Sequence, residues 1–268
     1  MKILTTILIL SLLLACLVLP ISAASSAAGV SSAPADTTGT PPQEASAYIS
    51  EAKVAVAATN WTDALIITTR GIAWYPENAD LLCLQGYTYR KIGQYQKAVD
   101  TVSRAILLDP TQVRYANRGY AYLALGNNTA ALADAEEGIA LNATYPANWD
   151  VKALALNGQG KNSEALAAVD QALALVPDNA HCWHVKGKIL ASGKDCAGAT
   201  AALEKSLALD AGYVLPWPGF GSAGDDLAAL NVTCSAPQSS PQATAKSPLG
   251  WLAVVGIIGA VIAIGIRK

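Results

Sequence analysis

The chain has little of the chemistry from which enzyme sites are built. Its 268 residues include only two histidines, His181 and His184, and charged residues make up 14%. No GxSxG, HExxH, GxGxxG or P-loop spacing occurs, so the common signatures of hydrolases, metalloproteases and nucleotide-binding enzymes are missing. The two histidines lack a third and a fourth ligand nearby, which argues against a zinc site. We therefore predict a protein that is not an enzyme and that uses no cofactor or metal.

Strong charge of either sign is also missing. The formal net charge is −2, and no basic run occurs between the two ends of the chain. This balance argues against a nucleic-acid partner, which would require a basic patch or stripe. Hydrophobic residues, in contrast, make up 52% of the chain, and their excess lies at the two ends.

Residues 1–24 have the layout of a secretory signal peptide. Lys2 precedes an apolar run, Pro20 follows it, and small residues offer cleavage sites after Ala23 or Ala24. A second interpretation places a lipoprotein box at LLAC, with Cys16 as the lipidated residue. The apolar run continues past this cysteine, where a polar residue is expected, so we favour the signal peptide.

Residues 249–266 are uncharged and apolar. This length is close to the ~20 residues that a transmembrane helix requires. Arg267 and Lys268 follow directly, and basic flanks stay in the cytoplasm. The sequence thus predicts a single-pass protein of the cell membrane, with its body on the extracellular side and a short cytoplasmic C-terminus. Small residues spaced four apart in this segment allow a weak homodimer through the span.

The C-terminal arrangement also resembles a tripartite sorting signal, made of a short motif, a span and a basic end. In archaeal surface proteins a PGF motif stands directly before the span. Here PGF occupies Pro218–Phe220, well upstream of residues 249–266. Retention of the span and its processing by a sorting enzyme therefore both stay open.

The middle of the chain repeats with a period of about 33–34 residues. Five repeats follow one another, at residues 45–78, 79–111, 112–145, 146–179 and 180–213. Counted from the first residue of each repeat, positions 8, 20 and 27 always hold small residues. Positions 4, 8 and 11 have helical spacing, and so do positions 20, 24 and 27, so each repeat contains two helices. Small residues at positions 8 and 20 let the two helices approach closely.

Turn and stop signals bound these helices. A glycine separates the helices in most repeats, and proline follows the second helix at Pro76, Pro110 and Pro177. Because one helix pair cannot bury its apolar face alone, the repeats must stack.

The repeats resemble the tetratricopeptide repeat family. Two of the best matching segments are LLCLQGYTYRKIGQYQKAVDTVSRAILLDP and WDVKALALNGQGKNSEALAAVDQALALVPDN. The resemblance implies an all-α protein, an α-solenoid in which antiparallel helix pairs form a right-handed superhelix, with one C-terminal transmembrane helix added. The usual leucine at position 7 is replaced by Glu51, Gln85, Arg118, Lys152 and Lys186. We expect the long stems of these side chains to cover apolar surface while their heads reach water.

The remaining segments are predicted connectors. Residues 25–44 form a disordered linker rich in small and polar residues. Residues 214–232 form a capping loop and a short helix that seal the last repeat. Residues 233–248 are a flexible stalk that leads to the span.

The resemblance also implies a binding surface, since the first helices of such repeats line a concave groove that commonly binds peptides or protein segments. Positions 2, 5, 9, 12 and 13 are the exposed ones on that face. Tyrosines and cations stand there, which favours a ligand with acidic or aromatic groups over the alternative of an ordinary solvated surface. The candidate groove residues are Lys53, Cys83, Tyr87, Arg90, Lys91, Tyr120, Asp150, His184 and Lys188.

Two functions are consistent with this organisation. The first is a membrane-anchored, outward-facing scaffold that binds a protein or peptide partner in the concave groove. The alternative is a structural accessory component of a cell-surface or envelope assembly.

Sequons and cysteines bear on the outward-facing location. Four sequons fall at predicted turns, at a junction or beyond the last repeat, and their glycosylation candidates are Asn60, Asn127, Asn142 and Asn231. Asparagine also suits turns in its own right. Cys182 and Cys196 are expected near opposite ends of one helix pair, too far apart for a disulfide. Cys83 and Cys234 also remain after signal removal, and the sequence leaves the partner of Cys234 open.

Overall fold

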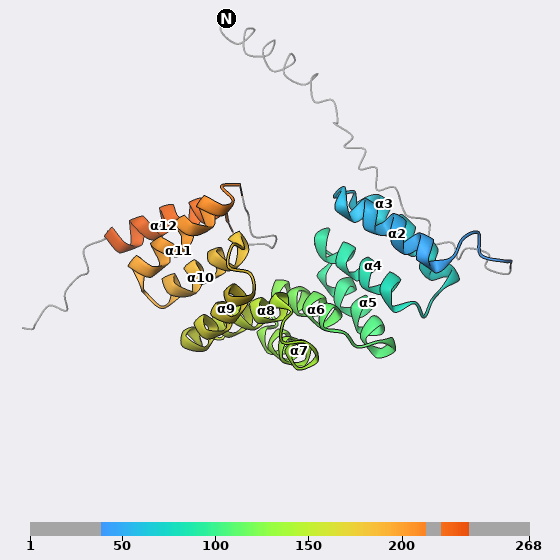
Figure 1. Ribbon diagram of the computed structural model, residues 1–268, viewed down its shortest axis with the longest axis horizontal. Coiled ribbons are helices and arrows are strands. Elements are labelled where there is room, and N and C mark those ends of the chain that lie inside the picture. Colours follow the sequence, from blue (N-terminus) through green and yellow to red (C-terminus); the bar gives the residue numbers. More distant parts are fainter. Residues whose placement is uncertain (1–38, 213–220, 236–268) are drawn as a thin grey trace, which may run out of the picture. The chain divides into compact units, whose positions relative to one another are not determined.

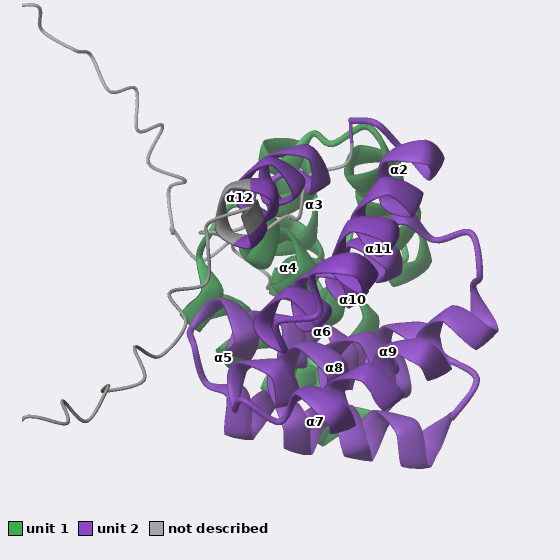
Figure 2. Ribbon diagram, turned by 90° about the vertical axis from the view of Figure 1, so that its left-hand side faces the viewer, with its two compact units in different colours: residues 1–109 green, residues 110–268 purple. Residues whose placement is uncertain are grey.

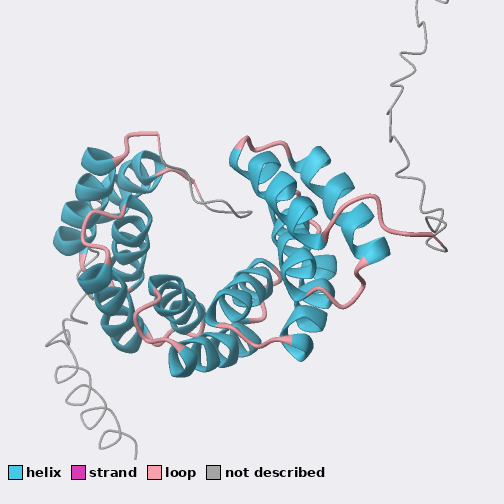
Figure 3. Ribbon diagram, turned by 45° about the vertical axis from the view of Figure 1, so that its right-hand side comes forward, coloured by secondary structure: helices cyan, strands magenta, loops and turns pink. Residues whose placement is uncertain are grey.

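The computed structural model describes residues 39–212 and 221–235 (Figure 1). This part of the chain consists of eleven helices joined by short loops, and it contains no strand (Figure 3). The helices are α2 (Ala45–Ala57), α3 (Trp61–Trp74), α4 (Ala79–Lys91), α5 (Tyr95–Leu108), α6 (Gln112–Ala124), α7 (Asn128–Leu141), α8 (Pro146–Gly158), α9 (Asn162–Leu175), α10 (Ala180–Ser192), α11 (Cys196–Leu209) and α12 (Ala223–Ser235). The predicted all-α class is therefore confirmed.

Several predicted segments lie outside the described residues. These are the signal peptide, most of the linker and of the capping loop, most of the stalk, and the transmembrane helix at residues 249–266. None of the helices that the structure does describe is both long enough and apolar enough to span a bilayer.

The chain divides into two compact units, residues 1–109 and residues 110–268 (Figure 2). Unit 1 contains helices α2 to α5, and unit 2 contains helices α6 to α12. Within each unit the two helices of a repeat pack against each other, and the second helix also packs on the first helix of the next repeat. This arrangement buries the apolar face that a single helix pair would leave open.

Local signals set the helix ends. The side chains of Asn60, Asn78, Thr111, Asn127, Asn179 and Asp195 accept the backbone N–H of the third residue of the helix that follows. Such capping satisfies one of the donors that a helix start leaves unpaired. Between paired helices the backbone enters the left-handed region at Gly93, Gly126 and Gly160. In the first and last repeats Thr59 and Lys194 take this conformation instead, at φ values of 55° and 65°.

The core of each repeat lies between its two helices. The alanines at position 20 are 1% exposed or less, and they are Ala64, Ala98, Ala131, Ala165 and Ala199. A Cβ added at Gly187, at position 8, would lie 2.7 Å from Cγ of Leu203 on the partner helix. Small residues at these two positions therefore permit the close approach that the sequence predicts.

Contrary to what the sequence predicts, the polar side chains at position 7 do not simply extend into water. Four of the five side chains instead pair with a polar residue on an adjacent second helix, sixteen positions away in the sequence. The pairs are Gln85–Thr69 at 3.1 Å, Arg118–Asp134 at 2.7 and 2.9 Å, Lys152–Glu136 at 3.1 Å and Lys186–Asp170 at 2.8 Å. Polar pairs between helices thus replace the leucine contact of the family pattern.

Helix α12 packs on α11 and α10, beyond the last repeat. It buries Ala223 and Leu230 against α11 and runs to Ser235, three residues beyond the predicted end of the cap. A disulfide joins Cys196 at the start of α11 to Cys234 near the end of α12, with the two Cα atoms 6.2 Å apart. The structure thereby supplies the partner of Cys234 that the sequence left open, whereas Cys182 is buried beside α9.

Candidate binding surface

Two aromatic rings and two cations gather in unit 1. The ring centroids of Trp61, the first residue of α3, and Tyr87 of α4 lie 6.2 Å apart. The Nζ atom of Lys91 lies 5.5 Å from the Tyr87 centroid and 5.9 Å from the Trp61 centroid. The Arg90 guanidinium carbon lies 5.0 Å from the Tyr87 centroid. We call these four residues the aromatic–cation cluster.

Electrostatics make this cluster receptive to an anion. Arg90 and Lys91 are neighbours in the last turn of α4, so two positive charges lie close together. Burial lowers the pKa of Lys91, and the charge of Arg90 lowers it further. An anionic group placed beside Lys91 would relieve both effects, because it favours the charged ammonium.

Two of the predicted groove residues in unit 1 are less exposed than expected. Arg90 and Cys83 are each only 9% exposed, so the prediction that they are exposed is wrong. The Arg90 side chain packs on the face of Tyr87, and Cys83 lies in the core beside Leu82 and Ala105. Lys53 on α2 is exposed, as expected, and it is not one of the four residues of the aromatic–cation cluster.

Trp61 is not among the predicted groove residues, because it lies on the second helix of its repeat and the prediction concerns the first helices. Its signal was a tryptophan directly after a turn, within the sequon Asn60-Trp61-Thr62. At that position the repeat pattern requires no large core residue.

In unit 2 three consecutive first helices share one buried carboxylate. Tyr120 of α6 donates its hydroxyl to Oδ2 of Asp150 of α8 at 2.7 Å. Nε2 of His181 of α10 lies 2.6 Å from the same oxygen. Asp150 is 1% exposed, so the prediction of an exposed groove residue is wrong for it. Its carboxylate connects the three helices, which is a structural role.

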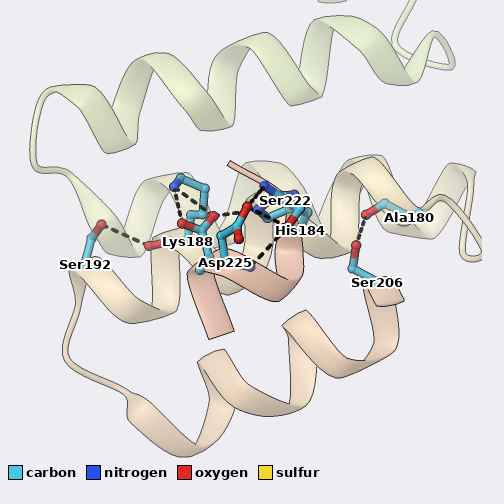
Figure 4. Close-up of polar contacts among 8 residues, drawn as sticks. Ala180, His184, Lys188, Ser192, Ser206, Ser222 and Asp225 are labelled. Atoms are coloured by element: carbon cyan, nitrogen blue, oxygen red, sulfur yellow. Dashed lines mark hydrogen bonds and ion pairs between the residues drawn. The ribbon is translucent and has the colours of Figure 1, made fainter. Parts of the chain in front are cut away.

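A second buried histidine lies against the terminal helix (Figure 4). Nε2 of His184 and Nζ of Lys188 lie 2.6 and 3.0 Å from Oδ2 of Asp226 of α12. His184 is completely buried, and burial lowers its pKa while the hydrogen bond to Asp226 opposes that shift. The prediction of an exposed His184 is therefore wrong, because α12 supplies its partner, while Lys188 stays partly exposed.

Hydrogen bonds at the start of α12 fix the helix N-terminus directly before Asp226. Ser222 donates its hydroxyl to Oδ2 of Asp225 at 2.8 Å, and its oxygen accepts the backbone N–H of Asp225 at 3.1 Å. These bonds begin the helix in the manner of an N-cap (Figure 4). Asp226 is the next residue, so the cap helps to position the carboxylate that holds His184.

Three of the four sequon asparagines have structural roles. Asn60 and Asn127 are exposed and cap helices α3 and α7, and Asn231 is exposed on α12. Asn142 is half-buried and accepts hydrogen bonds from Thr144. Glycosylation of these four residues stays a prediction. Within residues 39–212 and 221–235, no three His, Cys, Asp or Glu side chains are placed to hold a metal ion.

Comparisons with known proteins identify the repeats. Three models of the tetratricopeptide repeat match residues 68–100, 114–145 and 151–214. The chain contains tetratricopeptide repeats. Tetratricopeptide-repeat proteins are generally non-catalytic scaffolds for protein–protein interaction. No curated protein matches the sequence significantly.

Solved structures show the same fold. The tetratricopeptide-repeat protein TTC0263 of Thermus thermophilus is 19% identical and has a TM-score of 0.60. The match covers 70% of this chain and the whole of TTC0263. A chain of the APC/C hetero-tetramer Cut9–Hcn1 is 16% identical over 72% of this chain, with a TM-score of 0.64, and only 37% of that chain is matched. MamA of Desulfovibrio magneticus RS-1 is 18% identical over 64% of this chain and 98% of its own, with a TM-score of 0.53. At such identities the likeness concerns the fold alone.

Proposed function

We propose that this protein is a scaffold that binds a partner protein through an acidic segment, and that the aromatic–cation cluster of unit 1 is the contact site. The observation that carries the proposal is the position of Lys91, whose ammonium lies within 6 Å of both the Trp61 and the Tyr87 rings (5.9 and 5.5 Å). Among the predicted groove residues, Asp150 and His184 are buried, whereas Tyr87 and Lys91 remain partly accessible.

Recognition would combine charge with apolar contact. A carboxylate of the partner pairs with Lys91, and an aromatic or aliphatic side chain of the same segment packs on the Trp61 and Tyr87 rings. Cation–π contacts of the kind already present contribute ~0.5–1 kcal/mol each at exposed sites. The cluster therefore favours a short acidic segment with at least one large apolar residue.

Replacing Lys91 with glutamate tests this site. We expect Lys91→Glu to reduce capture of the partner at least tenfold, about 1.4 kcal/mol, because it puts a negative charge against an acidic segment. The measurement is affinity capture by the full chain from its own cell envelope, quantified by mass spectrometry and then by titration with the identified partner.

Lys53→Glu is the matched control for that experiment. It makes the same charge reversal at an exposed lysine of α2, outside the cluster, and should leave capture unchanged. Equal loss in both variants, or loss in neither, would contradict the proposed site. A partner that ignores Lys91→Glu but is lost on deletion of residues 249–266 would favour the alternative, a structural component of an envelope assembly.

We also propose that the body of the protein faces outward and is anchored by residues 249–266. The apolar terminal segments and the basic C-terminus support this orientation. The disulfide between Cys196 and Cys234 adds support, because disulfides persist in oxidising compartments outside the cytoplasm.

Protease treatment of intact cells tests the orientation. An epitope inserted at the exposed Gly39, before the first repeat, should be lost, whereas a tag placed after Lys268 should be protected until the membrane is opened. Protection of both tags in intact cells would show that the body does not face outward.

A further inference from the structure

Unit 2 has a cavity of ≈ 480 Å³ between α10, α11 and α12. Its lining includes the buried Leu203 of α11 and Leu230 of α12, together with Ala191 of α10 and Ala229 of α12. The volume lies within the range of small-molecule sites in proteins. The cavity lies beside the disulfide between Cys196 and Cys234, and both cysteines line it.

Small side chains explain why this space stays open. Three of the seven residues that α10 and α12 contribute to the lining, Ala191, Ser192 and Ala229, have side chains too short to fill the space between the helices. The disulfide holds the start of α11 and the end of α12 at a Cα–Cα distance of 6.2 Å, so neither helix end can collapse into the cavity independently.

The polar residues in the lining carry a net positive charge. Among the described residues of the lining, Lys188 and Lys194 contribute two ammonium groups and Asp226 contributes one carboxylate. That carboxylate already pairs with Lys188 at 3.0 Å and lies 2.6 Å from His184. A bound anion would balance the remaining positive charge.

We propose that this cavity binds a small aliphatic carboxylate, whose chain packs on Leu203 and Leu230 and whose carboxylate lies beside Lys188 and Lys194. The lining contains alanine, leucine and the disulfide but no aromatic side chain among the residues described, so an alkyl chain fits it better than a ring. Charge complementarity selects a carboxylate over a neutral or cationic head. This site is independent of the aromatic–cation cluster in unit 1.

Equilibrium dialysis of radiolabelled decanoate against the full chain tests the proposal. The protein is used with its disulfide oxidised, in lipid nanodiscs, with empty nanodiscs as the background. We expect saturable binding of one decanoate per chain. Decyltrimethylammonium, which has the same chain with a positive head, should bind at least tenfold more weakly, and acetate should not compete.

Two variants and two matched controls locate the binding. Ala229→Leu enlarges a side chain of the lining and Lys194→Glu reverses the charge of another, and each should weaken decanoate binding at least tenfold. Ala228→Leu and Lys205→Glu make the same changes at exposed positions of α12 and α11 outside the lining, and they should bind like the wild type. Absence of saturable binding, equal binding of the cationic analogue, or normal binding by Ala229→Leu would each overturn the proposal.

Discussion

Replacing Cys196 and Cys234 together with serine is expected to lower the free energy of unfolding of unit 2 by about 4 kcal/mol. The two cysteines are 38 residues apart in the sequence, so their bond restricts a long loop of the unfolded chain. A loop of that length gives about this value in the chain-entropy description of disulfides. Amide hydrogen exchange followed by mass spectrometry under increasing urea measures the effect on peptides from α11 and α12 separately from those of unit 1.

The oxidised wild type, treated with a dithiol reductant, provides the control for this prediction. Reduction should reproduce the loss of protection in α12, and the double serine variant should not respond to the reductant. Equal stability of the variant and the oxidised wild type would contradict the prediction and would also remove one support for an outward-facing location.

Replacing Arg118 with leucine is expected to cost about 3 kcal/mol of folding stability at neutral pH. Arg118 donates two hydrogen bonds, of 2.7 and 2.9 Å, to the carboxylate of Asp134, which is 4% exposed. Removing the guanidinium leaves the buried carboxylate of Asp134 without its main partner. Leucine is the usual residue of the family at position 7, so the new side chain itself is expected to fit. Urea unfolding of both proteins, followed by circular dichroism, measures the difference.

The pH dependence of this difference has a definite sign. In the wild type burial raises the pKa of Asp134, and the Arg118 contacts partly oppose that shift. Without Arg118 the folded-state pKa rises further above the unfolded value of ~3.9. A group whose pKa is raised in the folded state loses its stabilising contribution as the pH rises through that pKa. The loss of folding stability in Arg118→Leu, relative to the wild type, should therefore be largest at neutral pH and become smaller as the pH falls.

Asp134→Asn in the Arg118→Leu background is the control for the buried charge. The added change removes the negative charge, so the double variant should be more stable than Arg118→Leu at pH 7 and should show little pH dependence in this range. A deficit in Arg118→Leu that is the same at pH 4 and pH 7 would show that lost packing, not the unpaired carboxylate, causes the destabilisation.

The candidate binding surface was predictable only in part. Tyr87 and Lys91 do lie together in unit 1, because positions 9 and 13 of one helix fall on the same face. Trp61, which completes the aromatic pair, comes from the preceding helix, and the helical period of α4 says nothing about it. A search along one helix face cannot find a contact that depends on how two helices pack.

The sequence by itself determined the helical repeats of this protein. Small residues at positions 8 and 20, capping side chains and turn glycines act within a few residues, so their consequences can be read locally. Only the tertiary structure decided which polar residues are accessible. Asp150 is buried where it bonds to Tyr120 and His181. His184 is buried against Asp226, which lies 42 positions later, on a helix outside the repeat pattern. Burial of this kind depends on side chains that meet only when the helices stack, and no periodicity along the chain encodes it.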